Sequence, residues 1–376
     1  METKLVKLGD IISLNYGKAL TKKNRIPGDV PVYGSSGITD YHDKPLVDAP
    51  SLIIGRKGSI GSVFLSEVPF YPIDTTYFAK ESDLNGLDLH FAYYFLKFLP
   101  LSEMNTDSAI PGLNRNNFYS LDVVIPDIKS QKIIAFLLDQ ISYKIKINQQ
   151  INKNLLQMME NCYRKMLKNA IYNHQSKQSN ILTVADNIIT GKTPSTKNPG
   201  YYGGDTPFIT IPDMQGNVFV TVTKKRLTQS GTSVQQNKEI PALSLNVSCI
   251  GTVGLVTINP TVAHTNQQIN SVIVSKDKLW ELFFELRSLK GVMENMASGG
   301  TTILNMNKAI FSKLQINLLS HAIRKQFNAY ANPIFEQILI NDEQNHKLAK
   351  VRDLLLPKLL AGEINISFIE EAIKNA

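Results

Sequence analysis

Cationic side chains gather in two stretches that are otherwise rich in polar and turn-forming residues. The first stretch contains Lys18, Lys22, Lys23 and Arg25, and the second contains Lys192, Thr193, Lys197, Asn198, Tyr201, Lys224, Lys225 and Arg226. Lysine and arginine suit phosphate oxygens, whereas polar and planar groups can also reach base edges. Any one of these residues is more often an ordinary solvated surface group. As a set they predict a phosphate-contacting surface with a few base-reading side chains.

A glycine-rich turn carries two further cations, Arg56 and Lys57. The turn, Gly55–Gly61, stands between Pro50-Ser-Leu-Ile-Ile and Ser62-Val-Phe-Leu, so the order predicts a strand, a turn and a strand. Glycines three positions apart do not match the dinucleotide-binding fingerprint, so a tight hairpin is favoured over a nucleotide cradle. We expect both cations at the tip of this hairpin, facing solvent or a partner.

Catalytic and metal-binding patterns are missing from the sequence. A phosphate loop would need glycine five positions before Gly191, where Asp186 stands. No Gly-x-Ser-x-Gly elbow or Asn-Pro-Pro-Tyr-like methyltransferase motif occurs, and the six histidines show no paired metal spacing. Neither Cys162 nor Cys249 has a metal-ligand neighbour. We expect no metal site and no enzyme activity in this chain alone, an unrecognised catalytic site being the alternative.

Part of the chain is repeated with a shift of 193 positions. Ser51-Leu52 falls on Ser244-Leu245, and Gly58-Ser-Ile-Gly61 falls on Gly251-Thr-Val-Gly254. A repeat of this length indicates a duplicated domain and not a short solenoid unit. Arg56 and Lys57 are replaced by cysteine and isoleucine in the second copy. Such a difference on a shared scaffold is what two separate sequence readings would require.

Each copy predicts a mixed α and β domain with the same order of elements. In the first copy we expect strands at 75–79 and 121–125, a helix at 87–99, and a loop from Pro111 to Asn117. In the second copy we expect a strand-turn-strand at 242–256, strands at 271–274 and 314–318, and a helix at 277–296.

Two long helices, from Ser130 to about Asn173 and from about Ala322 to Gly362, follow the two copies. Their apolar positions alternate four and three apart, which is typical of a helix-pairing seam. The repeated seam comprises Ile141, Ile145, Asn148, Asn152 and Leu155 in the first helix, and Ile334, Ile338, Asn341, Asn345 and Leu348 in the second. Buried asparagines fix register at a cost in stability. Matching seams in one chain favour antiparallel pairing with each other over a homodimer coiled coil.

The length of these helices suggests a ruler. A helix of about 39 residues spans roughly 58 Å, and one turn of B-DNA about 34 Å. Two domains on such a spacer would have internal pseudo-two-fold symmetry, which duplex DNA shares because its strands are related by two-folds.

The composition describes a water-soluble protein that is permissive for nucleic acid. The 376 residues carry a formal charge of +8, and 43% are hydrophobic. No apolar run approaches the roughly 18 residues of a membrane span, and the segment from Met1 has no signal-peptide core. We therefore expect a cytoplasmic protein without membrane association.

These features together resemble the specificity subunit of type I restriction–modification systems, across essentially the full chain. The second copy opens with Gly191-Lys-Thr-Pro-Ser195 and Asn198–Phe208, which resemble the start of a target recognition domain. Ile125–Asp139 resembles the entry to the first conserved helix, and Arg352–Ile364 resembles the C-terminal conserved helix. Ser130 departs from the usual glutamate at the first entry, and Ile323-Arg324 stands at the second.

The resemblance implies an α+β fold with four parts. Target recognition domains are expected at 1–129 and 176–321, and conserved helical regions, packed as an antiparallel coiled coil, at 130–175 and 322–376. It also implies binding of double-stranded DNA at a bipartite target and docking of two adenine-methylating subunits and of restriction–translocation subunits. S-adenosylmethionine, ATP and Mg would belong to those partners, with no cofactor in this chain. A partner that fuses methylation and cleavage, or a scaffold role without sequence reading, are the alternatives.

Overall fold

The computed structural model describes residues 2–104, 112–298 and 304–366, and the chain divides into two compact units. Unit 1 comprises Met1–Lys146 with His346–Ala376, and unit 2 comprises Ile147–Asn345. The two long helices, α4 (Ile128–Tyr172) and α11 (His321–Leu360), each contribute one segment to either unit. Each unit therefore consists of a globular part and a pair of helix segments.

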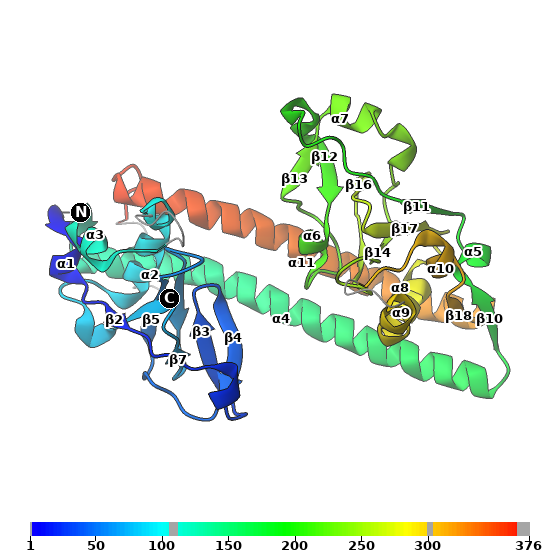
Figure 1. The fold of residues 1–376 in the computed structure, drawn as a ribbon, viewed down its shortest axis with the longest axis horizontal. Helices are drawn as coiled ribbons and strands as arrows, with labels where there is room; N and C mark the ends of the chain where they lie inside the picture. The colour runs from blue at the N-terminus through cyan, green and yellow to red at the C-terminus, as the bar shows by residue number, and fades with distance from the viewer. Residues whose placement is uncertain (1, 105–111, 299–303, 367–376) are drawn as a thin grey trace. The chain divides into compact units, whose positions relative to one another are not determined.

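Unit 1 is a succession of short strands and few helices before α4 (Figure 1). Its elements are β1 (Thr3–Lys7), α1 (Leu8–Ile11), β2 (Asn15–Tyr16), η1 (Lys22–Asn24), β3 (Val30–Gly34), β4 (Gly37–His42), β5 (Ser51–Gly55), β6 (Val63–Ser66), β7 (Tyr71–Pro72), β8 (Thr76–Lys80), η2 (Glu81–Asp83), α2 (Leu89–Phe98), η3 (Leu101–Glu103), α3 (Arg115–Ser120) and β9 (Asp122–Pro126).

Unit 2 repeats this order with additional short helices. Its elements are β10 (Ser176–Asn180), α5 (Ile181–Val184), β11 (Asn187–Thr190), η4 (Pro199–Tyr201), β12 (Tyr202–Ile209), α6 (Ile211–Met214), β13 (Lys225–Leu227), α7 (Gln229–Ser233), η5 (Gln236–Lys238), β14 (Leu245–Ser248), β15 (Val256–Ile258), β16 (His264–Thr265), β17 (Ile269–Ile273), α8 (Leu279–Ser288), α9 (Lys290–Ala297), α10 (Lys308–Ser312) and β18 (Gln315–Leu319).

The sheets of the two units have the same topology. Unit 1 contains a four-stranded sheet of order β2-β8-β5-β6, a three-stranded sheet β4-β3-β7 and the pair β1-β9. Unit 2 contains β11-β17-β14-β15, β13-β12-β16 and the pair β10-β18. In each three-stranded sheet one pairing is parallel, β3 with β7 and β12 with β16. The duplication predicted from the sequence is confirmed at the level of strand pairing.

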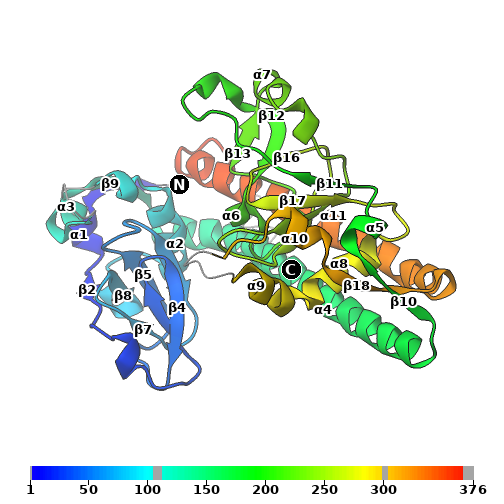
Figure 2. The same ribbon diagram turned by 45° about the vertical axis from the view of Figure 1, so that its right-hand side comes forward.

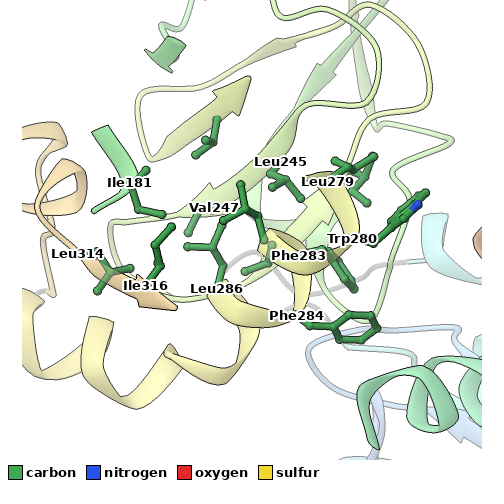
Figure 3. Packing of buried hydrophobic residues seen from close by; sticks show 14 of the residues in the cluster. Ile181, Leu245, Val247, Leu279, Trp280, Phe283, Phe284, Leu286, Leu314 and Ile316 are labelled. Carbon is green, nitrogen blue, oxygen red and sulfur yellow. The ribbon is translucent and has the colours of Figure 1, made fainter. Parts of the chain in front are cut away.

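Each unit encloses its own hydrophobic core. In unit 1, Phe91 and Phe95 of α2 stack at 5.4 Å and pack with Leu52 and Ile54 of β5. In unit 2, the side chains of α8 occupy the equivalent place, beside Leu245 and Val247 of β14 (Figure 3). Every residue of β5 and β14 is buried. Both faces of these strands are therefore covered, and the helices cover one of them.

Two of the predicted elements differ from the structure. The helix expected at 277–296 is broken at Leu289, whose ψ of 10° ends α8 and precedes α9. The apolar period continues across this break, and periodicity alone does not reveal it. The loop expected from Pro111 to Asn117 gives way to α3 at Arg115, where Asn114 caps the helix; Pro111 itself lies outside the described residues.

The asparagines of the helix seam bond to one another inside unit 2. Asn148 Nδ2 donates to Asn345 Oδ1 at 3.0 Å, and Asn341 Nδ2 donates to Asn152 Oδ1 at 2.7 Å. As the residue number increases along α4, the number of its partner in α11 decreases. The two segments therefore run antiparallel. Asn152 also donates to Asp342 Oδ1 at 2.8 Å and to the Ile338 carbonyl at 3.0 Å. Pairing the amides satisfies groups that would otherwise be unpaired in the seam.

The same antiparallel arrangement occurs in unit 1. Leu138 of α4 lies in one buried cluster with Leu356 and Leu359 of α11. One turn further along, Arg352 Nη1 lies 3.5 Å from Ser142 Oγ. The seam thus changes from aliphatic packing in unit 1 to amide pairs in unit 2.

Replacing Asp342 by asparagine is expected to stabilise the chain above pH 6. Burial raises the pKa of Asp342 to about 6, so the energetic penalty of its ionised form appears as the pH rises from about 4 through 6. D342N can still accept from Asn152 and should gain roughly 1–2 kcal/mol at pH 8, once partial exposure to water is allowed for. At pH 4 the difference should vanish. Urea unfolding at both pH values measures it, and an equal difference at both would contradict the assignment.

Candidate nucleic-acid interface

The glycine-rich turn of unit 1 forms a hairpin, as predicted, but it does not expose both of its cations. Gly58 and Gly61 have φ values of +82° and +70°, a region that side chains other than glycine disfavour. Lys57 is exposed. Arg56 is half-buried, and its Nη1 donates to the Asp74 carbonyl at 3.1 Å. Arg56 thus follows β5 in the turn, but its side chain is held against the Asp74 carbonyl, whereas that of Lys57 is open to solvent.

Arg56 lies in a cavity that no sequence motif indicates. Its guanidinium carbon lies 4.9 Å from the centre of the Tyr16 ring and 5.7 Å from that of Tyr77. The guanidinium of Arg115 lies 5.0 Å from the same Tyr16 ring, from the side of α3. These residues and Lys57 line a cavity of about 280 Å³. Burial and the neighbouring Tyr16 raise the pKa of Tyr77, and Arg56 opposes this rise.

The other predicted cations of unit 1 lie outside the lining of this cavity. Lys22 and Lys23 belong to η1, and both are exposed. Arg25 donates to Asp40 Oδ2 at 2.9 Å, and this bond holds the pKa of Asp40 below its usual range. Lys18 is exposed two positions after Tyr16.

Lys18 and Lys192 occupy equivalent positions in the two units. The backbone N–H of Lys18 donates to the Pro72 carbonyl, and that of Lys192 donates to the Thr265 carbonyl, each at 3.0 Å. The glycine before each lysine allows this approach. A Cβ added at Gly17 would lie 2.1 Å from the Ile73 oxygen, and at Gly191 2.3 Å from the Thr265 oxygen. Close packing of the backbone thus explains why glycine precedes the lysine in both units.

In unit 2, contacts join the segments that carry the predicted residues, and these residues are called the unit 2 surface. Tyr202 Oη donates to the Pro194 carbonyl at 2.7 Å, which joins the segment after Lys192 to the hairpin of β12 and β13. Lys225 on β13 lies 5.6 Å from the centre of the Tyr202 ring. In both views this hairpin and α7 lie at the edge of unit 2 away from its segment of α4 (Figures 1 and 2). Exposed members of the surface are Lys192, Lys197, Asn198, Lys224, Lys225 and Arg226.

Some polar residues of this surface have internal partners. Thr193 Oγ1 donates to Gln267 Oε1 at 2.6 Å, and Asn198 Oδ1 accepts from the Gly200 N–H at 3.1 Å, which caps η4. Arg226 donates to the carbonyls of Gly204 and Asp205. Tyr201 is half-buried, and its carbonyl accepts from Thr228. These groups shape the surface, while the lysine ammonium groups remain at its exterior.

The residues that depart from the family pattern at the helix entries anchor each long helix to its own domain. Ser130 donates to Asp127 Oδ2 at 2.7 Å at the start of α4. Gln131 accepts from the Asp88 N–H at 2.8 Å. In unit 2 the shift of 193 brings Arg324 to the position of Gln131, and Arg324 bonds to Glu281, the counterpart of Asp88. The hydrogen bond between Gln131 and the Asp88 backbone in unit 1 is thus replaced in unit 2 by the buried ion pair of Arg324 and Glu281.

The described residues offer neither a metal site nor a membrane span. In the part of the chain that the structure describes, no group of three or more histidine, cysteine, aspartate or glutamate residues could hold a metal ion. No helix among the described residues is long and apolar enough to cross a membrane.

The repeated fold agrees with the result of a comparison with protein families. The model of the type I restriction modification DNA specificity domain matches residues 1–157 and again residues 176–339. The chain therefore belongs to this family, and each of its two copies corresponds to one match.

Among curated relatives, the type I restriction enzyme HindI specificity subunit of Haemophilus influenzae is 47% identical over 180 residues, covering 47% of this chain and 39% of the relative. The EcoprrI specificity subunit of Escherichia coli is 27% identical over 176 residues, covering 43% of either protein. The chain thus spans less than half the length of these two relatives. The S subunit of a type I restriction-modification system from M. genitalium shares the fold, with a TM-score of 0.59 at 13% identity, over 95% of this chain and 96% of that one.

Proposed function

We propose that this chain is a DNA-recognition subunit that reads a bipartite target with its two specificity domains. The observation that carries the proposal is the repeat of one sheet topology in both units, with different side chains at equivalent loops. A shared scaffold positions each reading surface in the same way, and different loops allow two different half-sites. Lysines of the loops would contact phosphates, and neighbouring polar groups would read base edges.

Chemistry on the DNA would belong to partner subunits. We infer that α4 and α11 dock two methyltransferase subunits, which supply S-adenosylmethionine, and that restriction–translocase subunits supply ATP and Mg. Segments of both helices carry exposed apolar residues outside the seam, including Tyr143, Ile151, Ile340 and Leu354, which support docking of a protein partner. The chain itself would be non-catalytic.

The paired helices would set the distance between the half-sites. α4 has 45 residues and α11 has 40, and each passes from one unit into the other. The antiparallel seam fixes their register through the Asn148–Asn345 and Asn152–Asn341 pairs. Because the two helices cannot slide past each other, the length of the paired region is constant. A constant length would give a spacer of constant length in the DNA target.

Mapping of methylated adenines tests the proposal. Genomic DNA of the source organism should carry a bipartite motif, two short half-sites around an unspecified spacer, and deletion of the gene should remove methylation of that motif. Retention of every methylated motif after deletion would overturn the proposal. Loss of a motif without two separated halves would contradict reading by two domains.

Lys57→Ala and Lys225→Ala should each weaken binding to all DNA sequences alike. Each removes an exposed ammonium group, and the slope of log K against log salt concentration should fall by about 0.9 for every phosphate that is no longer neutralised. Binding of the full chain to a 60-bp duplex of mixed sequence, measured by fluorescence anisotropy between 50 and 200 mM salt, gives this slope. Lys276→Ala, which removes an exposed cation outside both predicted sets, is the matched control. An unchanged slope would exclude the residue from the interface.

A further inference from the structure

Among the residues that the structure describes, the lining of the unit 1 cavity carries three cations and no acidic residue. Its lining comprises Tyr16, Arg56, Lys57, Tyr77, Gly112, Leu113, Asn114, Arg115 and Asn116. No carboxylate lies in this lining, and the lining is mostly polar. The residues that the structure describes also supply no ion pair to Arg56 or Arg115 within 4.0 Å. Cations held close together without counter-charge indicate a site for an anion.

Both guanidinium groups lie against the ring of Tyr16. Arg56 and Arg115 lie 4.9 and 5.0 Å from the centre of the Tyr16 ring. The Arg56 Nη1 also donates to the Asp74 carbonyl, and the backbone of Arg115 is fixed in the first turn of α3. The Nε of Arg115 is buried and has no partner among the described residues. Contact with the Tyr16 ring does not consume guanidinium donors, so the donors other than Arg56 Nη1 remain available to a ligand.

The second unit shows that the fold does not need these residues. Tyr16 pairs with Tyr77 across β2 and β8, as Thr190 pairs with Asn270 across β11 and β17. Thr190 Oγ1 lies 2.6 Å from Asn270 Oδ1, and Asn270 Nδ2 donates to the sulfur of Cys249 at 3.2 Å. Cys249 stands where unit 1 has Arg56, and it is only 2% exposed. The same scaffold is thus closed in unit 2 by small hydrogen-bonded residues.

The counterpart of Arg115 is also used differently. Lys308 follows the cap Asn307, as Arg115 follows the cap Asn114. Lys308 Nζ donates to the carbonyl of Ile188 and so bonds within its own unit. In unit 1 the Arg56 guanidinium makes one such bond, from Nη1 to the Asp74 carbonyl, and the Arg115 guanidinium makes none among the described residues. The remaining donors are explained better by a ligand than by a structural need.

We propose that the cavity lined by Tyr16, Arg56 and Arg115 binds one phosphodiester group of the DNA backbone beside the half-site read by unit 1. Two arginine forks match the oxygens of a phosphate, and charge-assisted bonds of this kind are the stronger class. Lys57, exposed in the lining, and Lys18, exposed two positions after Tyr16, would attract the neighbouring phosphates. The proposal deepens the proposed function, since it gives unit 1 an anchor that unit 2 lacks.

The salt dependence of binding tests the phosphate contact. R56Q, R115Q and the double variant are compared with the wild type on the 60-bp duplex of mixed sequence. The double variant should lower the salt slope by about 0.9, one phosphate in total, and weaken binding three- to tenfold at 100 mM salt. Lys44→Gln, an exposed cation of the same unit, should leave the slope unchanged. A slope unchanged in the double variant, or lowered by the equivalent of about two phosphates, would overturn the single shared phosphate.

Further arms separate the alternatives. R56K keeps the charge and should restore most of the slope, and thermal unfolding of each variant excludes a simple loss of fold. If the variants weakened binding to some sequences only, the cavity would read a base and the proposal would be wrong. If titration calorimetry showed inorganic phosphate binding to the wild type without DNA but not to R56Q/R115Q, the site would serve a free ligand. Binding to mixed-sequence DNA does not depend on the methylated motif, so failure of the proposed function is distinguishable.

Discussion

Arg324→Ala is expected to lower the free energy of unfolding by about 3–5 kcal/mol, because it leaves a buried carboxylate without its cation. Glu281 is fully buried, and its Oε2 accepts from Arg324 Nε. Its Oε1 accepts from the Leu319 N–H at 2.9 Å. Arg324 also donates to the Leu319 carbonyl at 2.9 Å, so one side chain links α8, β18 and α11. Its removal would release the long helix from the domain that it supports.

The pH dependence of this loss follows from the pKa of Glu281. Burial raises that pKa and Arg324 lowers it, so the variant should have the more strongly raised value. An acid with a raised pKa in the folded state is destabilised as the pH rises from its unfolded value, about 4.3, through the folded value. The loss in Arg324→Ala should therefore be full at pH 8 and shrink as the pH falls toward 4.

Unit 2 contains a built-in probe for this experiment. Trp280, the single tryptophan of the chain, stacks on Phe335 at 4.1 Å and neighbours Glu281 in α8. Urea unfolding followed by its fluorescence reports the unit directly. The double variant E281Q/R324A removes the buried charge and should recover part of the loss, whereas Asp277→Asn, at the exposed end of the network, should cost less than about 1 kcal/mol. No recovery in the double variant would contradict an unpaired charge as the cause.

Those parts of the structure that depend on local patterns are predictable from the sequence. The seam asparagines are visible because helical spacing repeats every seven residues, and the hairpin glycines because positive φ favours glycine. Arg56 can be selected as a candidate DNA contact because it is a cation next to these turn glycines. The direction of its side chain is not visible in the turn, since the side chain bonds to the carbonyl of Asp74, eighteen positions away in the chain.

The cavity around Arg56 depends on contacts that no local pattern records. Tyr16 reaches it through pairing of β2 with β8, and Arg115 through a short helix where the sequence predicts a loop. Arg324 is likewise visible in the sequence only as a departure from the family pattern. Its role comes from Glu281, 43 positions earlier, which becomes its partner when α8 and α11 pack together. Long-range pairs of this kind leave no local signature in the sequence, and they are where the two units differ most.

Removing one heptad from both long helices is expected to shorten the spacer of the DNA target by about three base pairs. Deletion of 148–154 from α4 and of 339–345 from α11 takes out both asparagine pairs, Asn148–Asn345 and Asn152–Asn341, together. The remaining seam keeps its alternation, because Leu155 and Leu348 then follow Ile145 and Ile338 at the same step as the asparagines did. Seven residues of helix correspond to about 10 Å, and one base pair rises about 3.4 Å.

Deletion from one helix alone provides the contrast. Removing only 148–154 would place the asparagines of α11 opposite apolar residues of α4, leaving their amides unpaired at about 1–3 kcal/mol for each group. We expect this variant to lose assembly and methylation altogether, while the matched double deletion methylates a target with a shortened spacer. Methylation mapping in a host that co-expresses each variant with the modification subunit distinguishes them. If the double deletion methylated the original target with its spacer unchanged, the helices would not measure the distance between half-sites, and the spacing would have to be set by the partner subunits.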